Sequence, residues 1–143
     1  MNRIQKCELM VQKFIYDNLS TQLQYLGRPV PFLLSGSPEA SNNEIALPFV
    51  EAEWTPGTSD AVGTDLRSTD INGVLTFYVF MPPNLDPVMA KGIPSDIDEA
   101  CLRKRSEYPE GVLTFGRSVM MNSRRVGTSD MVVLEVDTRI IIS

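Results

Sequence analysis

Histidine is absent from this sequence of 143 residues, which removes the commonest general base and the commonest zinc ligand. Nucleophilic sites that combine Cys with His, or Ser with His and Asp, are therefore excluded. Cysteine is scarce as well, and Cys7 and Cys101 alone cannot form an all-thiolate zinc site. Gly57 and Gly63 lack the sequence context of a phosphate-binding loop. We therefore predict a protein that is no enzyme and has no cofactor.

Long hydrophobic runs are also missing. A membrane-spanning helix needs about 18 to 20 consecutive apolar residues, and the sequence contains no such run. The N-terminus carries Arg3 and Lys6 but no apolar core of a signal peptide. Both cysteines fall on apolar faces of predicted helices, where they indicate buried free thiols and a reducing compartment. We expect no contact with a membrane.

Basic residues are outnumbered by acidic ones, 13 to 18, so the net charge is -5 and the isoelectric point lies near 4.7. An acidic surface repels nucleic acid unless basic residues cluster on it. The remaining composition, 43% hydrophobic and 22% charged, is that of a globular protein. Its length predicts a single domain over residues 1–143.

The densest run of β-branched and aromatic residues, Ile71 to Met81, carries no charge and predicts the central strand of a sheet. One face of this strand carries Leu75, Phe77, Val79 and Met81, and the other carries Val74, Thr76, Tyr78 and Phe80. Because both faces are largely apolar, we expect both to be covered, by helices or by neighbouring subunits.

Two amphipathic helices are predicted. The first runs from residue 3 to about 25, with an apolar stripe that either binds a partner or, as we favour, packs on the protein's own sheet. The second runs from Ser95 to about Ser106, with Ser95 and Asp98 resembling a capping box and basic residues in the last turn. The stripe of the first helix comprises Ile4, Cys7, Val11, Phe14 and Ile15.

Further strands are predicted at about 45–54, 112–115, 117–125 and 131–142, separated by turns and proline-rich connectors. This order predicts an α+β fold, with a mainly antiparallel sheet of four to five strands and two helices packed on one face. Between the first strand and the central one, residues 55–70 are polar and predict a mobile β-hairpin loop that becomes ordered on assembly.

Charged residues in three places are candidates for contacts with a neighbouring subunit or another partner. In the 55–70 loop they are Asp60, Asp65 and Arg67. Arg124 and Arg125 stand beside a predicted turn, where they meet an acidic partner surface or solvent. On the last strand, Val132, Leu134, Val136, Ile140 and Ile142 line one face, and the opposite face carries Glu135, Asp137 and Arg139.

The order of these elements resembles the tail terminator proteins of long-tailed, lambda-like bacteriophages and the related tail terminator-like families. An amphipathic helix is followed by a proline-bearing strand, PFVEAEWTPG, and then by a polar loop, TSDAVGTDLRSTD. A strand of the form GVLTFYVFM comes next, and a Pro/Gly-rich lead enters the second helix. The chain closes with strands that end in MVVLEVDTRIII. The prolines at 82, 83, 87 and 94 depart from the usual lead into that helix.

The resemblance implies a structural virion protein, assembled in the host cytoplasm and placed at the head-proximal end of the tail. Such a protein forms a ring, which we expect to be a hexamer, and this ring caps the tail tube and ends its polymerisation. Its partners would be the tail tube protein and a head-completion (connector) protein, and DNA would pass through the lumen without specific binding. The last strand's charges would line the lumen or pair across the subunit boundary. Two alternatives stay open: another phage neck or tube component, or a small α+β ligand-binding domain.

Overall fold

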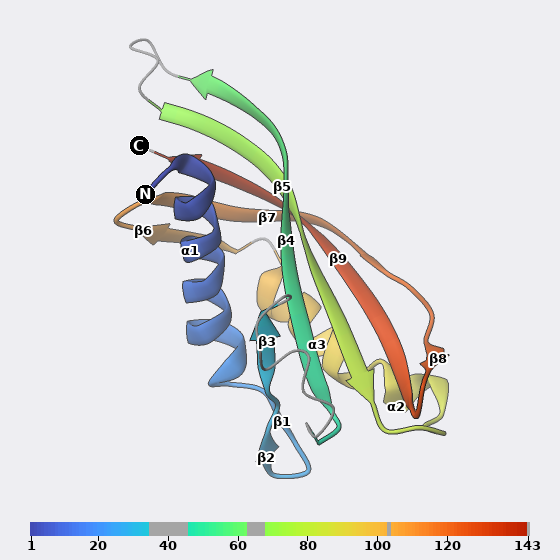
Figure 1. Ribbon diagram of the computed structural model, residues 1–143. Coiled ribbons are helices and arrows are strands. Elements are labelled where there is room, and N and C mark those ends of the chain that lie inside the picture. The colour runs from blue at the N-terminus through green and yellow to red at the C-terminus, as the bar shows by residue number, and fades with distance from the viewer. Residues whose placement is uncertain (35–45, 63–67, 103, 143) are drawn as a thin grey trace.

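The computed structural model describes residues 1–34, 46–62, 68–102 and 104–142 (Figure 1). The fold is α+β, with a strongly curled sheet of seven strands rather than the predicted four or five. The strand order is β3-β4-β5-β9-β7-β6, where β7 covers Gly111–Met120. The short strand β8 (Arg124–Val126) adds to β9. All pairs in this sheet are antiparallel except β3 with β4. The prediction did not include the short edge strand β6 (Arg105–Tyr108), and it treated Phe32–Leu34, which forms β3, as a short extended piece that was not counted as a strand.

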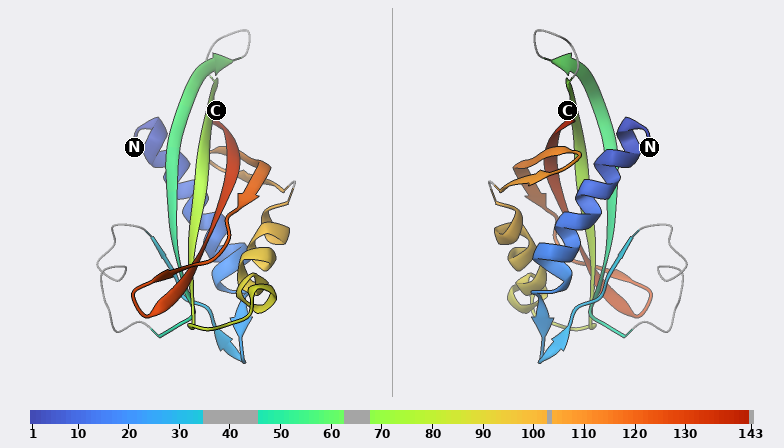
Figure 2. Two further views of the ribbon diagram at one scale, coloured as in Figure 1. Left: turned by 90° about the vertical axis from the view of Figure 1, so that its right-hand side faces the viewer. Right: turned by 90° about the vertical axis from the view of Figure 1, so that its left-hand side faces the viewer.

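The central strand is β5 (Ser68–Met81), as predicted, between β4 (Phe49–Val62) and β9 (Ser129–Ile142). β4 and β5 form a long hairpin that projects beyond the N-terminal end of α1 (Figures 1 and 2). Residues 55–62 and 68–70, predicted as loop, therefore belong to paired strands. Most side chains of these segments are polar, so the sequence shows no alternation of apolar residues that would predict strands there. The hairpin itself was expected. Residues 63–67 lie outside the described part of the chain.

The first helix, α1 (Arg3–Ile15), begins at a capping box that joins Asn2 and Gln5. After Ile15 it widens into a π-helical turn, η1 (Tyr16–Ser20), so it ends earlier than the predicted residue 25. The small hairpin of β1 (Gln24–Tyr25) and β2 (Arg28–Pro29) follows, and its turn has Leu26 and Gly27 at positive φ.

The second helical region both starts and ends earlier than predicted. Asp86 caps the one-turn helix α2 (Pro87–Ala90), and α3 (Gly92–Cys101) follows directly. Pro94 lies in the first turn of α3, where no intrahelical N–H bond is lost, so it does not delay the helix. Ser95 is thus inside the helix and does not cap it. The helix ends at Cys101, and the chain from Arg105 to Tyr108 pairs with Gly111–Thr114 in the sheet.

One hydrophobic core joins the helices to one face of the sheet, here called the inner face. From α1 it takes Cys7, Met10, Val11, Phe14 and Ile15, and the ring centroids of Phe14 and Phe115 lie 4.5 Å apart. α3 contributes Ile93, Ile97 and Cys101. The interpretation of α1 as a helix packed on its own sheet is therefore confirmed. Inner-face residues of the two central strands include Leu75, Phe77, Val79 and Met81 on β5 and Val132, Leu134, Val136 and Ile140 on β9.

Gly73 has a specific place in this architecture. The indole N–H of Trp54, on β4, donates to the hydroxyl oxygen of Thr138, on β9, at 2.9 Å. β5 lies between these two strands, and a Cβ at Gly73 would approach the Trp54 ring to 2.8 Å. The glycine in the middle of a central strand therefore leaves space for the indole to cross β5 and reach Thr138.

Candidate functional site

The opposite, outer face of the sheet carries the charged residues predicted on the last strand. Glu135 lies opposite Thr76 of β5, and Asp137 lies opposite Val74. On the far side of β5, Glu53 lies opposite the same Thr76 and Glu51 opposite Tyr78. Neighbouring strands are about 4.8 Å apart, so Glu53 and Glu135 flank Thr76 at roughly 10 Å from each other. Four carboxylates therefore gather on this face: Glu51, Glu53, Glu135 and Asp137.

The local electrostatics of the outer face follow from this gathering. Burial raises the pKa of Tyr78, and the negative charges of Glu53, Glu135 and Glu51 raise it further. Burial also raises the pKa of Glu51, which is partly covered by its neighbours. The contribution of the three glutamates to the pKa of Tyr78 has the sign expected near negative charges, whereas burial alone raises the pKa of Glu51. Glu51 and Glu53 belong to the site although our candidates did not include them. The sequence pattern that could have identified them is their alternation with the apolar residues Val50, Ala52 and Trp54.

Arg139 does not join this acidic group. Its Nη2 lies 2.7 Å from Oδ2 of Asp70, and its Nε donates to the same oxygen at 2.9 Å. Asp70 raises the pKa of Arg139 by accepting this hydrogen bond and by its charge. The three predicted residues of the last strand thus separate into an intrachain ion pair, which uses Arg139, and two carboxylates that make no ion pair with the described residues.

A hollow of about 610 Å³ lies on the outer face beside these carboxylates. Its position coincides with an irregularity of β4 between Pro56 and Ser59, where the register to β5 shifts. Gly57 and Gly73 line it, and neither contributes a side chain that would fill it. Residues with polar side chains that line it include Thr55, Asn72, Thr76, Glu135 and Asp137.

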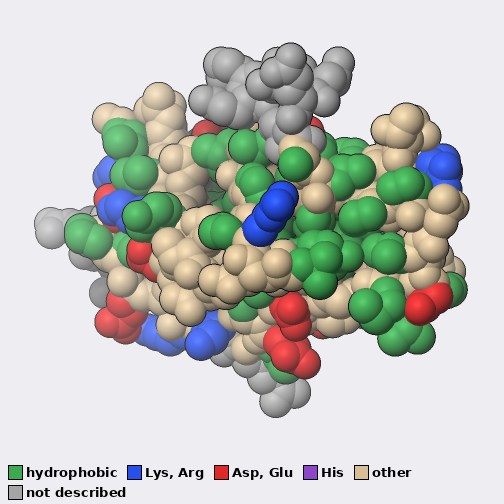
Figure 3. All heavy atoms as spheres, turned by 90° about the horizontal axis from the view of Figure 1, so that it is seen from below, with side chains coloured by type: hydrophobic (Ala, Val, Ile, Leu, Met, Phe, Trp, Pro, Cys, Tyr) green, Lys and Arg blue, Asp and Glu red, His purple; other side chains and the backbone are tan. Residues whose placement is uncertain are grey.

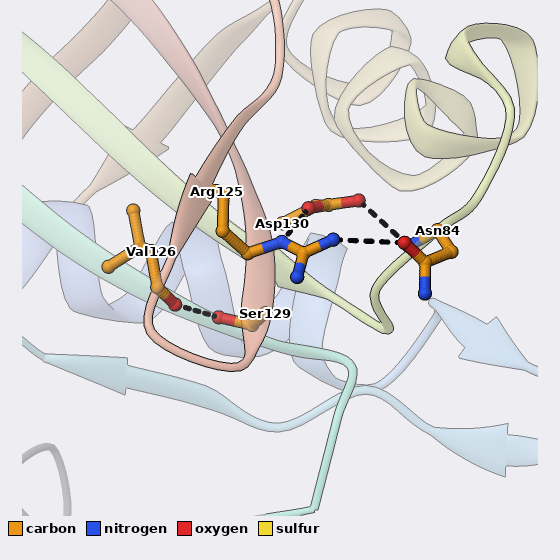
Figure 4. A network of polar contacts seen from close by, with 5 residues as sticks. All are labelled: Asn84, Arg125, Val126, Ser129 and Asp130. Carbon is orange, nitrogen blue, oxygen red and sulfur yellow. Dashed lines mark hydrogen bonds and ion pairs between the residues drawn. The ribbon is translucent and has the colours of Figure 1, made fainter.

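Arg125 is held within its own subunit (Figure 4). Its Nε donates to Oδ1 of Asp130 at 2.9 Å, and its Nη2 donates to Oδ1 of Asn84 at 3.0 Å. The backbone N–H of Asn84 donates to the other oxygen of Asp130 at 3.2 Å. This network fastens the turn between β8 (Arg124–Val126) and β9 to the segment that follows β5. Arg124, by contrast, is exposed and makes no ion pair with the described residues.

Of the predicted loop residues, Asp60 is in β4, where its backbone pairs with Asp70. Asp65 and Arg67 lie outside the described residues, so the predicted mobility and contacts of this segment stay predictions.

At the other end of the molecule, seen from below in Figure 3, hydrophobic side chains gather with isolated charges among them. Leu26 and Val88 are the most exposed large hydrophobic residues of the described chain, at 87% and 81%.

The two cysteine side chains lie in the core. Cys7 and Cys101 are buried free thiols, and burial raises their pKa values to about 11 and about 12. Such thiols stay protonated at neutral pH and are poor nucleophiles. Within the described ranges, no three acidic or cysteine side chains are arranged to hold a metal ion. None of the helices described is both long enough and apolar enough to cross a membrane.

Comparison with known proteins adds a likeness of fold. No protein-family model matches the sequence. No curated protein matches it either. Among the solved structures, one whose title states no function superposes with a TM-score of 0.67, over 93% of this chain and 94% of that one. The two sequences are 11% identical, so the likeness concerns the fold alone.

Proposed function

We propose that this protein is a phage tail terminator, a structural protein that forms a ring on the end of the tail tube. One observation supports this most: a sheet packed by helices on its inner face leaves an outer face that no described helix covers. That face combines half-buried aromatic residues, Tyr78 and Phe80, with four carboxylates. A neighbouring copy would bury part of this apolar surface, and a head-to-tail contact that closes on itself produces a ring.

In the proposed ring, a hexamer, Glu135 and Asp137 face the lumen. Their negative charge would keep the phosphates of passing DNA from binding to the wall. The net charge of -5 acts in the same direction. The ring would end polymerisation of the tube protein and present its other side to the head-completion protein. Its place would be the head-proximal end of the tail, in a virion assembled in the host cytoplasm.

The experiment is tube growth in the presence of this protein. Tail tube protein from the same phage is polymerised with and without the purified chain, and tube lengths are measured by electron microscopy. We expect a dense ring at one tube end and arrested growth. Tubes that elongate equally with and without the chain would contradict the proposal.

Deletion of the gene separates the terminator from the head-tail connector, the alternative structural role. Loss of a terminator gives overlong tails, whereas loss of a connector gives tails of normal length that stay unattached. Tail length in the deletion mutant therefore distinguishes the two.

A further inference from the structure

The outer face changes in character from one side of the sheet to the other. On the β4 side stand Phe49, Glu51 and Glu53, here called the acidic margin. The ring of Phe49 stacks on that of Phe80, with centroids 4.7 Å apart and planes 19° from parallel. This margin is thus an apolar platform beside two carboxylates that make no ion pair with the described residues.

On the far side, beyond β9, β7 (Gly111–Met120) and β8 carry the opposite charge. Val119 lies opposite Glu135, and Arg124 lies opposite Met131, whose partner on β5 is Phe80, so both belong to the outer face. Gly116 and Arg117 form a bulge opposite Asp137. We call the following residues the basic margin: Arg117, Val119, Met121 and Arg124.

The basic margin is open to solvent. Val119 is 51% exposed and Met121 44%, and both arginines are exposed. Within the described chain, neither Arg117 nor Arg124 forms an ion pair, whereas the adjacent Arg125 is bound to Asp130. Exposed hydrophobic side chains flanked by unneutralised arginines are typical of a surface that is covered in an assembly.

Both margins also lie where the sheet has incomplete edges. β3 pairs with β4 only along Val50–Ala52, and β6 pairs with β7 only along Gly111–Thr114. Beyond these short strands, the described edges of β4 and β7 have no partner strand. A neighbouring copy can therefore approach the basic margin without displacing a strand, whereas at the acidic margin β3 already lies beside Glu51.

We infer that the acidic margin of one copy binds the basic margin of the next, so that a second copy of this chain is the occupant of each surface. This inference rests on the ring proposed above and names its contacts. The two margins are complementary in charge and in apolar surface. Carboxylates meet guanidiniums, and the Phe49–Phe80 platform meets Val119 and Met121. Because the margins differ, the contact is head to tail and leaves a free margin at each end until the ring closes.

The proposed contact would also offset the cost of partly burying the charged side chain of Glu51. Partial burial disfavours its charged form, and a guanidinium from a neighbour would stabilise that form. Glu135 and Asp137 lie on β9, between β5 and the basic margin, and in the proposed ring they face the lumen. Charge pairing of this kind chiefly fixes which surfaces meet and in what orientation.

Charge reversal tests the inference. Variant A is Glu51→Arg with Glu53→Arg, which makes both margins basic, and variant B is Arg117→Glu with Arg124→Glu, which makes both acidic. The matched control is Glu135→Arg with Asp137→Arg, which changes the net charge as variant A does but between the margins. Association is measured by sedimentation velocity at low salt and high protein concentration, and the thermal unfolding of each variant checks its fold.

We expect variants A and B alone to self-associate at least about tenfold more weakly than the wild type, because like charges then meet at the contact. An equimolar mixture of A and B should restore association, with the two variants alternating around the ring. The control should associate as the wild type does.

The inference is overturned if the wild type associates but the mixture does not, or if the control is weakened as much as variant A. It also fails if wild type and mixture both remain monomeric. Association that follows the predicted pattern, in a protein that leaves tube growth unchanged, would retain these contacts and refute the terminator role. A ring on tubes that is insensitive to charge reversal would refute these contacts and retain the terminator role.

Discussion

The two faces of one sheet differ sharply, although the same strands form both. On β5, Phe77 and Val79 of the inner face are 0% exposed, whereas their neighbours Tyr78 and Phe80 on the outer face stay partly exposed. Helices α1 and α3 pack against the first set, and no described helix covers the second. The inner face therefore stabilises the subunit, whereas apolar surface of the outer face stays partly exposed in the described chain. The apolar residues of a strand therefore indicate how much of its surface avoids water, but they do not indicate which chain covers that surface.

The largest expected effect separates the two faces directly. Phe77→Ala should destabilise the subunit by about 3–5 kcal/mol, because it leaves a cavity in a close-packed core. Tyr78→Ala, one residue away, should cost no more than about 1 kcal/mol in the monomer, since its ring already contacts solvent. Urea unfolding at low protein concentration measures both. Similar losses for the two variants would break the distinction between the faces.

Gly73→Ala probes the crossing of the Trp54 indole. The added methyl group would lie 2.8 Å from the indole ring and 2.8 Å from the carbonyl oxygen of Thr55. We expect a loss of about 3 kcal/mol, the upper end of the usual cost of overpacking. Gly127→Ala is a contrasting control, since a Cβ there meets no atom within 4 Å and only the positive φ of 60° opposes it. Unfolding curves in which Gly127→Ala is the more damaging change would contradict this account.

Thr138→Val tests the hydrogen bond that the crossing makes. Valine has a similar shape but accepts no hydrogen bond, so the buried N–H of Trp54 would lose its partner at a cost of about 2 kcal/mol. Trp54→Phe removes the donor, and the double variant should lose less than the sum of the two single losses. Strict additivity in thermal or urea unfolding would show that the bond contributes nothing.

The smallest effect concerns the ion pair that holds α1 to the turn before β7. Nζ of Lys13 lies 2.8 Å from Oε1 of Glu110, and the hydrogen bond from Lys13 lowers the pKa of Glu110. A carboxyl whose pKa is lowered by folding stabilises the protein above its unfolded pKa, and this contribution is lost as the pH falls through the folded value. Lys13→Gln should therefore be slightly less stable than the wild type at pH 7. The difference should vanish in acid, and a gap that stays constant from pH 7 to pH 3 would rule out the pair as its source.

Several elements were predictable because their side chains follow one clear period. The alternation along Met131–Ile142 predicted the inner face of β9, and Val132, Leu134, Val136, Ile140 and Ile142 are all buried. The helical stripe of α1 was equally clear, except that Ile4 remains 38% exposed at the start of the helix. Alternation also placed Glu135 and Asp137 away from the core, because a strand that buries one side must direct the other side outward.

Other features depended on which strands meet. Nothing local in the sequence brings Glu51 and Glu53 to the same surface as Glu135, since only the registers of β4, β5 and β9 do so. The intrachain pairing of Arg139 with Asp70, and of Arg125 with Asp130 and Asn84, likewise follows from chain crossings. The second helix stops at Cys101, and the chain from Arg105 onward gains a partner strand.

The sequence by itself determined the α+β class, the central strand and the alternation that separates a buried side from an exposed one, because these follow from local periodicity. The tertiary structure alone decided that some charges form intrachain ion pairs and that others form two margins of opposite sign. The physical reason is that a charge is neutralised by whatever lies within a few ångströms of it, and that neighbourhood is made by residues far apart in the chain.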